Sequence, residues 1–150
     1  MELVDENLPS IPHHHEGQLL PIDEAVALVE RVRASAEQYA DRALQELAAD
    51  VPCIHGIALR ACPPLPATTA ERITDYRSRN VADWVMYREV LAAAARSRGW
   101  VVHWYDAKAA LKAAAQAKVR NGRPWAKEHR IAMAAAIAGA ALHESTTVSA

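Results

Sequence analysis

The sequence has 150 residues, with 17 Lys and Arg against 18 Asp and Glu, and 33 of its residues are alanine. This length fits one domain, and the composition excludes collagen-like, disulfide-scaffold and low-complexity proteins. Because alanine supplies so much of the 51% apolar content, larger side chains are left to form only a small hydrophobic core. We expect a helix-rich α/β protein.

Charge is distributed unevenly along the chain. Residues 1–70 hold 11 acidic and four basic residues, whereas residues 71–150 hold seven acidic and 13 basic residues. The two halves can neutralise each other inside one molecule, or the basic half can face an anionic partner such as nucleic acid.

The sequence carries no pattern typical of a targeting or membrane segment. The N-terminus lacks the basic-then-apolar order of a signal peptide. The longest apolar run, Ile131–Leu142, has 12 residues, and crossing a bilayer takes about 20. Cys53 and Cys62 lack CxxC spacing and are expected to be reduced thiols. We predict a cytoplasmic protein that does not contact a membrane.

Residues 1–22 differ from the rest in composition. They contain three prolines and a run of histidines at positions 13–15, without hydrophobic periodicity. This predicts a flexible N-terminal arm, followed by a single α/β domain over residues 23–150. The histidines have no carboxylate or cysteine at ligand spacing, which favours adventitious over specific metal binding.

The first predicted elements are a long helix and a buried strand. The helix covers residues 23–49, with Asp23 as its N-cap. Its apolar stripe recurs at three- and four-residue spacing through Val29, Val32, Ala36, Tyr39, Ala43 and Leu47. Residues 53–60 form a nearly continuous apolar run, which is typical of a strand buried on both faces in a parallel sheet.

Two helices are predicted next. Thr68 and Glu71 have the spacing of a capping box, which starts a short helix. Asn80 is expected to cap the following helix and Gly99 to end it. Trp84 belongs to the predicted buried stripe of this second helix.

The strongest strand signal is at residues 100–105, which are β-branched or aromatic apart from one histidine. Asp106 is expected to cap a helix from Ala107 to about residue 118. Two strands separated by helices predict a β-α-β core of few parallel strands in a right-handed crossover, covered by helices. Because two strands make a thin sheet, we expect a third strand or a strand from a partner chain.

The closing helix, Ile131–Leu142, is alanine-rich and apolar around its whole circumference. Such a helix lies in the centre of a fold or between protomers. It therefore predicts contact with a second copy or with a partner protein.

Candidate chemistry lies after the second strand, because ligands gather at the carboxyl ends of parallel strands. Asp106 and Lys108 form the D-x-K pattern found at metal-dependent nuclease sites; in the alternative interpretation Asp106 only caps the helix and Lys108 is solvated. His55 and His103 can form a metal site if they are adjacent. Motifs for P-loops, dinucleotides, zinc proteases and serine hydrolases are absent.

A basic segment follows at residues 118–130, with five Lys or Arg against one acid. Cationic side chains contact phosphates and an exposed indole stacks on bases. The candidate nucleic-acid contacts are Arg120, Arg123, Trp125, Lys127 and Arg130. In the alternative interpretation Trp125 packs in the core and the charges are solvated.

From Cys53 onward, the order of elements resembles the second half of the ribonuclease H fold, as in Holliday-junction resolvases. The resemblance implies a metal-dependent nuclease using Mg²⁺, with Asp106 and Glu128 as metal ligands and His129 or Lys108 as proton or phosphate partner. Strand 54–60 carries no acid and the chain does not open with a β-hairpin array, so a truncated or non-catalytic relative is also consistent.

Two functions follow. The first is a nucleic-acid-associated α/β domain, with residual nuclease activity as a narrower case. The second is a non-catalytic interaction or assembly protein that works through its terminal helix, where a polar residue at Ile137 would change oligomeric state.

Overall fold

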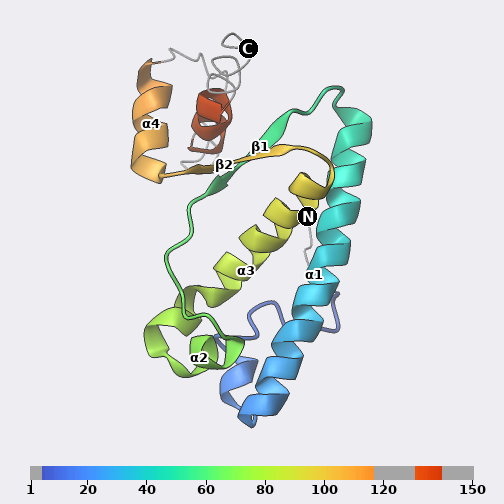
Figure 1. Cartoon of the computed structure of the whole chain (residues 1–150), viewed down its shortest axis with the longest axis vertical. Helices are drawn as coiled ribbons and strands as arrows, with labels where there is room; N and C mark the ends of the chain where they lie inside the picture. The colour runs from blue at the N-terminus through green and yellow to red at the C-terminus, as the bar shows by residue number, and fades with distance from the viewer. Residues whose placement is uncertain (1–4, 117–130, 140–150) are drawn as a thin grey trace. The chain divides into compact units, whose positions relative to one another are not determined.

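The computed structural model describes residues 5–116 and 131–139. The chain forms two compact units (Figure 1). We call Met1–Cys53 with Cys62–Arg98 the helical unit, and Ile54–Ala61 with Gly99–Ala150 the sheet unit. The predicted helix-rich α/β class is confirmed at this level. None of the described helices is both long enough and apolar enough to cross a bilayer.

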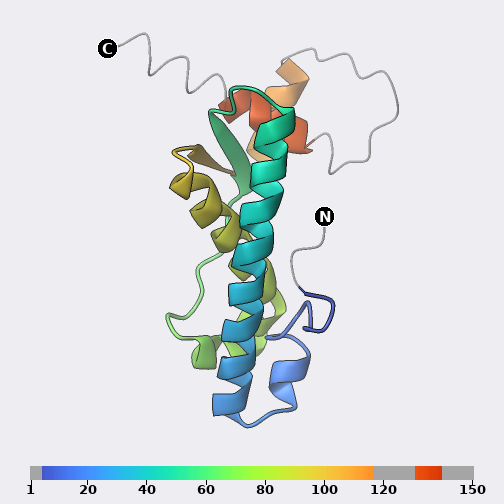
Figure 2. The same cartoon turned by 90° about the vertical axis from the view of Figure 1, so that its right-hand side faces the viewer.

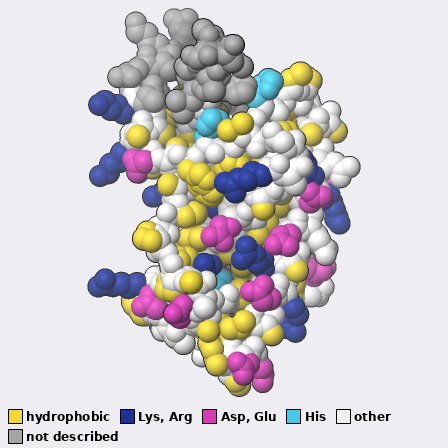
Figure 3. Space-filling view, in the orientation of Figure 1, with side chains coloured by type: hydrophobic (Ala, Val, Ile, Leu, Met, Phe, Trp, Pro, Cys, Tyr) yellow, Lys and Arg dark blue, Asp and Glu magenta, His cyan; other side chains and the backbone are white. Residues whose placement is uncertain are grey.

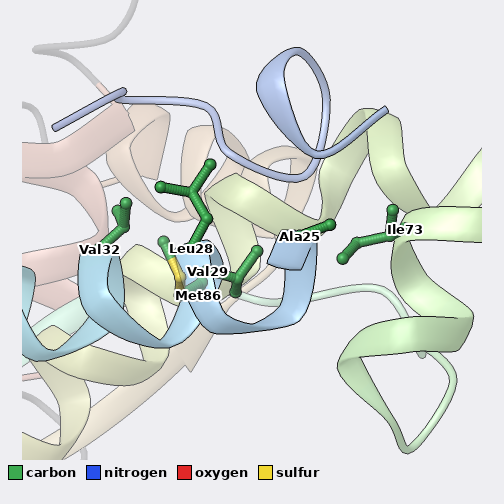
Figure 4. Close-up of a cluster of buried hydrophobic side chains, with 6 residues drawn as sticks. All are labelled: Ala25, Leu28, Val29, Val32, Ile73 and Met86. Atoms are coloured by element: carbon green, nitrogen blue, oxygen red, sulfur yellow. The ribbon is translucent and has the colours of Figure 1, made fainter. Parts of the chain in front are cut away.

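The helical unit is built on two long helices, α1 (Ile22–Asp50) and α3 (Tyr76–Ser97), which pack against each other. The short helix α2 (Thr69–Thr74) and the 3-10 turn η1 (Glu16–Gln18) pack on them, and Figure 2 shows the N-terminal segment beside α1. Apolar side chains from α1, α2 and α3 meet in one core cluster (Figure 4), made by Ala25, Leu28, Val29, Val32, Ile73 and Met86.

The capping box that begins α2 is confirmed. Thr68 Oγ1 accepts a hydrogen bond from the Glu71 backbone N–H at 3.2 Å, and Glu71 Oε2 accepts one from the Thr68 backbone N–H at 3.0 Å. The predicted cap of α1 is wrong, because the helix begins at Ile22 after Pro21 and Asp23 lies within its first turn.

The predicted start of α3 at Asn80 is also wrong. The helix begins at Tyr76, where Asp75 accepts a hydrogen bond from the Ser78 backbone N–H at 2.8 Å and acts as N-cap. Asn80 lies one turn inside the helix and donates its side-chain amide to the Tyr76 carbonyl. The predicted end is confirmed, since α3 stops two residues before Gly99, whose φ is 76°.

The buried face of α3 differs from the predicted stripe. Ala82, Val85 and Met86 face the core, but Trp84 is 63% exposed. The residue before it, Asp83, is only 2% exposed. Asp83 and Met86 lie on the buried face of α3, and Trp84 therefore falls on the exposed face. The size and polarity of these side chains alone would have predicted the opposite placement of Asp83 and Trp84.

The N-terminal segment is packed into the helical unit rather than extended as an arm. Pro12 and His13 are fully buried. A Cβ added at Gly17 would lie 2.5 Å from the Pro12 carbonyl oxygen, so this turn needs glycine for close approach of the backbone. The Asp5 backbone N–H donates to Ser35 on α1 at 3.0 Å. The described part of the predicted arm therefore contributes buried residues.

In the sheet unit, β1 (Gly56–Arg60) and β2 (Val101–Tyr105) pair in parallel, as predicted. The register runs from Gly56 opposite Val101 to Arg60 opposite Tyr105. The described chain contains two strands in this sheet, so a third strand stays a prediction. The helices between the strands, α2 and α3, belong to the helical unit, and the right-handed crossover also stays a prediction.

Small side chains hold the helices of the sheet unit against the sheet. Helix α4 (Ala107–Gln116) and the helical residues 131–139 bury Ala110, Ala134 and Ala135 against Ala58 and Tyr105. A Cβ added at Gly139 would lie 2.9 Å from the His103 ring. The described part of the closing helix thus packs within its own unit, while Ala132 and Ala136 are exposed.

Candidate functional site

The carboxyl ends of β1 and β2 bring one acid and two cations to the same edge of the sheet. Arg60 lies opposite Tyr105 in the register, and the Ala61 backbone N–H donates to the Tyr105 carbonyl at 2.9 Å, which continues the pairing past β1. Asp106 and Lys108 follow directly at the start of α4. We call Arg60, Asp106 and Lys108 the carboxyl-edge cluster.

Asp106 acts as the N-cap of α4, in agreement with the alternative interpretation of the D-x-K pattern. Its Oδ1 accepts hydrogen bonds from the backbone N–H groups of Lys108 at 2.9 Å and Ala109 at 3.0 Å. The Ala109 hydrogen bond, followed by the Lys108 hydrogen bond and the charges of Lys108 and Arg60, lowers the pKa of Asp106. The carboxylate is therefore ionised and held in place, and Lys108 is exposed.

The described residues do not assemble a metal centre. They contain no group of three His, Cys, Asp or Glu side chains placed to hold an ion. Of the site residues implied by the nuclease resemblance, Asp106 and Lys108 are described, whereas Glu128 and His129 lie outside the described residues. The register pairs His103 with Ala58, and His55 precedes β1, so the strand pairing does not place these two histidines opposite each other.

The basic segment at residues 118–130, with Arg120, Arg123, Trp125, Lys127 and Arg130, also lies outside the described residues. By residue number the segment falls in the sheet unit, so its charges are counted there. Counted over the two units, the sheet unit has eight Lys and Arg against three Asp and Glu, a balance of +5. The helical unit has nine against 15, a balance of −6. The charge asymmetry of the sequence therefore follows the division into units.

The helical unit mixes both signs of charge. Figure 3 shows acidic and basic side chains interspersed over the face that it presents. Arg33 lies 3.5 Å from Glu37 and 3.8 Å from Glu89, and Arg98 lies 2.5 Å from Asp41. The cations of this unit are thus partly neutralised by their own neighbours.

A buried polar cluster in the helical unit was missed by sequence reasoning. Asp83 Oδ1 lies 2.7 Å from His13 Nδ1 and accepts the His13 backbone N–H at 3.0 Å. Asp83 Oδ2 accepts the His14 backbone N–H at 3.1 Å. The histidine run is an informative signal, but nothing local indicates that its partner lies 70 residues away.

Tyr87, one turn after Asp83 on α3, adds to this cluster. Its hydroxyl donates to the Ser10 carbonyl at 2.7 Å. Burial and then the negative charge of Asp83 raise the pKa of Tyr87 to about 12. The hydroxyl therefore stays protonated and helps to hold the N-terminal segment on α3.

No protein-family model matches the chain, and neither the curated proteins nor the solved structures gave a match.

Proposed function

We propose that the sheet unit is a nucleic-acid-binding module that contacts phosphates at its carboxyl-edge cluster. The observation that carries the proposal is the parallel register, which places Arg60 beside the start of α4, where Lys108 lies, in a unit with a balance of +5. Cations held on strand ends and helix starts are well placed to bind phosphate, because the backbone fixes their spacing.

The cluster has its carboxylate already engaged in capping α4. Its two cations face one carboxylate, and Asp106 uses Oδ1 to accept two backbone N–H groups. A phosphate oxygen then meets Arg60 and Lys108 as the local cations. In the same proposal, Arg120, Arg123, Lys127 and Arg130 extend the phosphate contacts and Trp125 stacks on a base.

Salt dependence of DNA binding tests the proposal. Fluorescence anisotropy of the full chain with short single-stranded and branched DNA should give an affinity that falls steeply with KCl. Replacing both Arg60 and Lys108 by alanine should lower the slope of log K against log salt by about 2, since each lost phosphate contact removes about 1. Charge reversal at Arg123 and Lys127 should weaken binding further.

Lys112→Ala is the matched control. Like the substitution of Lys108, it removes one lysine charge from the same exposed face of α4, one turn further from the strand ends. It should leave the slope nearly unchanged. Equal slopes for the double variant and the unsubstituted chain would contradict the proposal.

The metal-dependent nuclease remains a narrower proposal, with Asp106 and Glu128 as ligands to Mg²⁺. Asp106→Asn tests it cleanly, because asparagine also caps helices and preserves the start of α4 while removing the charge. Cleavage of branched DNA that needs Mg²⁺ and disappears in this variant, with DNA affinity retained, would support a catalytic role. Binding without cleavage in the unsubstituted chain would leave the module non-catalytic.

A further inference from the structure

The helical unit carries a pocket that the proposed function does not use. It has a volume of about 380 Å³ and is lined by residues of the histidine run, of η1 and its C-terminal end, and of the start of α3. Its lining combines one arginine, two histidines and two amides with no acid: His14, His15, Gln18, Leu19, Tyr76, Arg79 and Asn80. A volume of this size suits a small organic ligand.

Arg79 is the strongest feature of this pocket. Its guanidinium carbon lies 5.0 Å from the centre of the Tyr76 ring, so the group is stacked on an aromatic face. Stacking leaves the N–H groups in the guanidinium plane to bind an anion side by side. The Nε of Arg79 is buried and has no hydrogen-bond partner among the described residues. A buried donor without a partner is costly, which points to an acceptor supplied by a ligand.

His14 offers a second unpartnered nitrogen. Its Nδ1 is likewise buried and unbonded within the described chain. The residue is held at both ends, because its backbone N–H donates to Asp83 at 3.1 Å and its carbonyl accepts the side-chain amide of Gln18. The backbone from which the ring extends is therefore held in place before a ligand arrives.

The remaining lining residues favour a ligand with more than one kind of group. The Asn80 amide nitrogen donates to the Tyr76 carbonyl at 2.7 Å, which leaves its oxygen to accept from a ligand hydroxyl. Leu19 and Tyr76 are 83% and 68% exposed and form an apolar rim. Glu16, whose buried Oε2 is also without a partner among the described residues, does not line the pocket.

We propose that this pocket binds a phosphate monoester of a small organic molecule, with Arg79 and His14 donating to the phosphate and the rim contacting the organic group. A phosphate has enough oxygens to accept from both side chains at once. The site is separate from the carboxyl-edge cluster, because it is made only by residues of the helical unit.

Calorimetric titration of the full chain tests this with phenyl phosphate, inorganic phosphate and benzoate. We expect phenyl phosphate to bind saturably and more tightly than the other two. Arg79→Gln should weaken it by about tenfold or more, the loss typical of a charged hydrogen bond. Arg77→Gln is the matched control, since Arg77 is an exposed arginine two residues away on α3 outside the pocket, and it should change the affinity less than about twofold.

Several outcomes would overturn the proposal. These are no saturable binding of phenyl phosphate, equal weakening by Arg77→Gln and Arg79→Gln, or benzoate binding as tightly as phenyl phosphate. If Arg79→Gln unfolds the chain, amide chemical shifts of the unsubstituted protein decide, because phenyl phosphate must move residues 14–19 and 76–80 first. Arg79→Gln should leave DNA affinity unchanged, so failure here is distinguishable from failure of the proposed nucleic-acid module.

Discussion

Asp83→Ala should be among the most damaging single substitutions in the helical unit. The carboxylate is 2% exposed and accepts from three donors: two backbone N–H groups and the ring of His13. The His13 ring donates to Asp83 in the tautomer that carries its hydrogen on Nδ1. Alanine leaves all three donors without this partner, two of them buried and the His14 backbone N–H partly buried.

The expected loss follows from these contacts. A buried donor that loses its partner costs about 1–3 kcal/mol, and three donors lose their acceptor here. Because His13 and its neighbours can relax toward solvent, the losses are not fully additive. We therefore expect the free energy of unfolding to fall by about 3–5 kcal/mol. Asp83→Asn keeps an acceptor oxygen and should lose less.

Urea unfolding followed by circular dichroism measures this loss. With an m-value of about 2 kcal/mol/M, the midpoint should fall by about 2 M at unchanged slope. Asp41→Ala is the control: it also removes an ion-pair carboxylate, 2.5 Å from Arg98, but one that is 60% exposed, and exposed pairs contribute at most about 1 kcal/mol. Equal small losses in both variants would refute the claim that Asp83 fixes the N-terminal segment on α3.

Three further predictions follow from other contacts. Gly56→Ala should increase the rate of amide hydrogen exchange along β2, because the added Cβ would lie 2.5 Å from the Val101 carbonyl oxygen. Unchanged exchange rates would show that β1 accommodates the added methyl group without loss of stability. Tyr87 has a folded pKa of about 12 and about 10 when unfolded, so its stabilising contribution is complete below pH 10 and is lost between pH 10 and 12. Tyr87→Phe should flatten that alkaline decline in thermal midpoint, and an identical decline would exclude Tyr87 as its source. If the alternative assembly function holds, Ile137→Asn should change the mass measured by light scattering, whereas a monomer that is insensitive to it would argue against assembly.

Elements whose signals are local were predictable from the sequence. The two strands are short apolar runs, and the Thr68 capping box closes over three residues. The start of α3 was not predictable, because Asp75 and Asn80 both have side chains that cap helices. In the structure Asp75 is the cap. No proline or glycine lies between Asp75 and Asn80 to mark where the helix begins.

The same distinction applies to the two candidate sites. Two members of the carboxyl-edge cluster, Asp106 and Lys108, were predicted as candidate site residues, because ligands gather at the carboxyl ends of parallel strands. The cluster around Asp83 joins residues 70 positions apart, and burying an acid is favourable only when donors are already in place. The composition around the histidine run predicted a flexible arm. The buried partner of His13, Asp83, is remote in sequence and could not be recognised from that segment.

The two units carry net charges of opposite sign, −6 for the helical unit and +5 for the sheet unit. The helical unit places Arg33 and Arg98 beside acids of its own. The sheet unit has three acids for eight bases, and one of them, Asp106, already caps α4. Its positive excess is balanced by charges outside this set of residues, either acids of the helical unit or anions. A nucleic acid that contacts these cations releases the counterions condensed on its own phosphates, so the slope of affinity against salt, more than the affinity itself, reports whether nucleic acid is the partner.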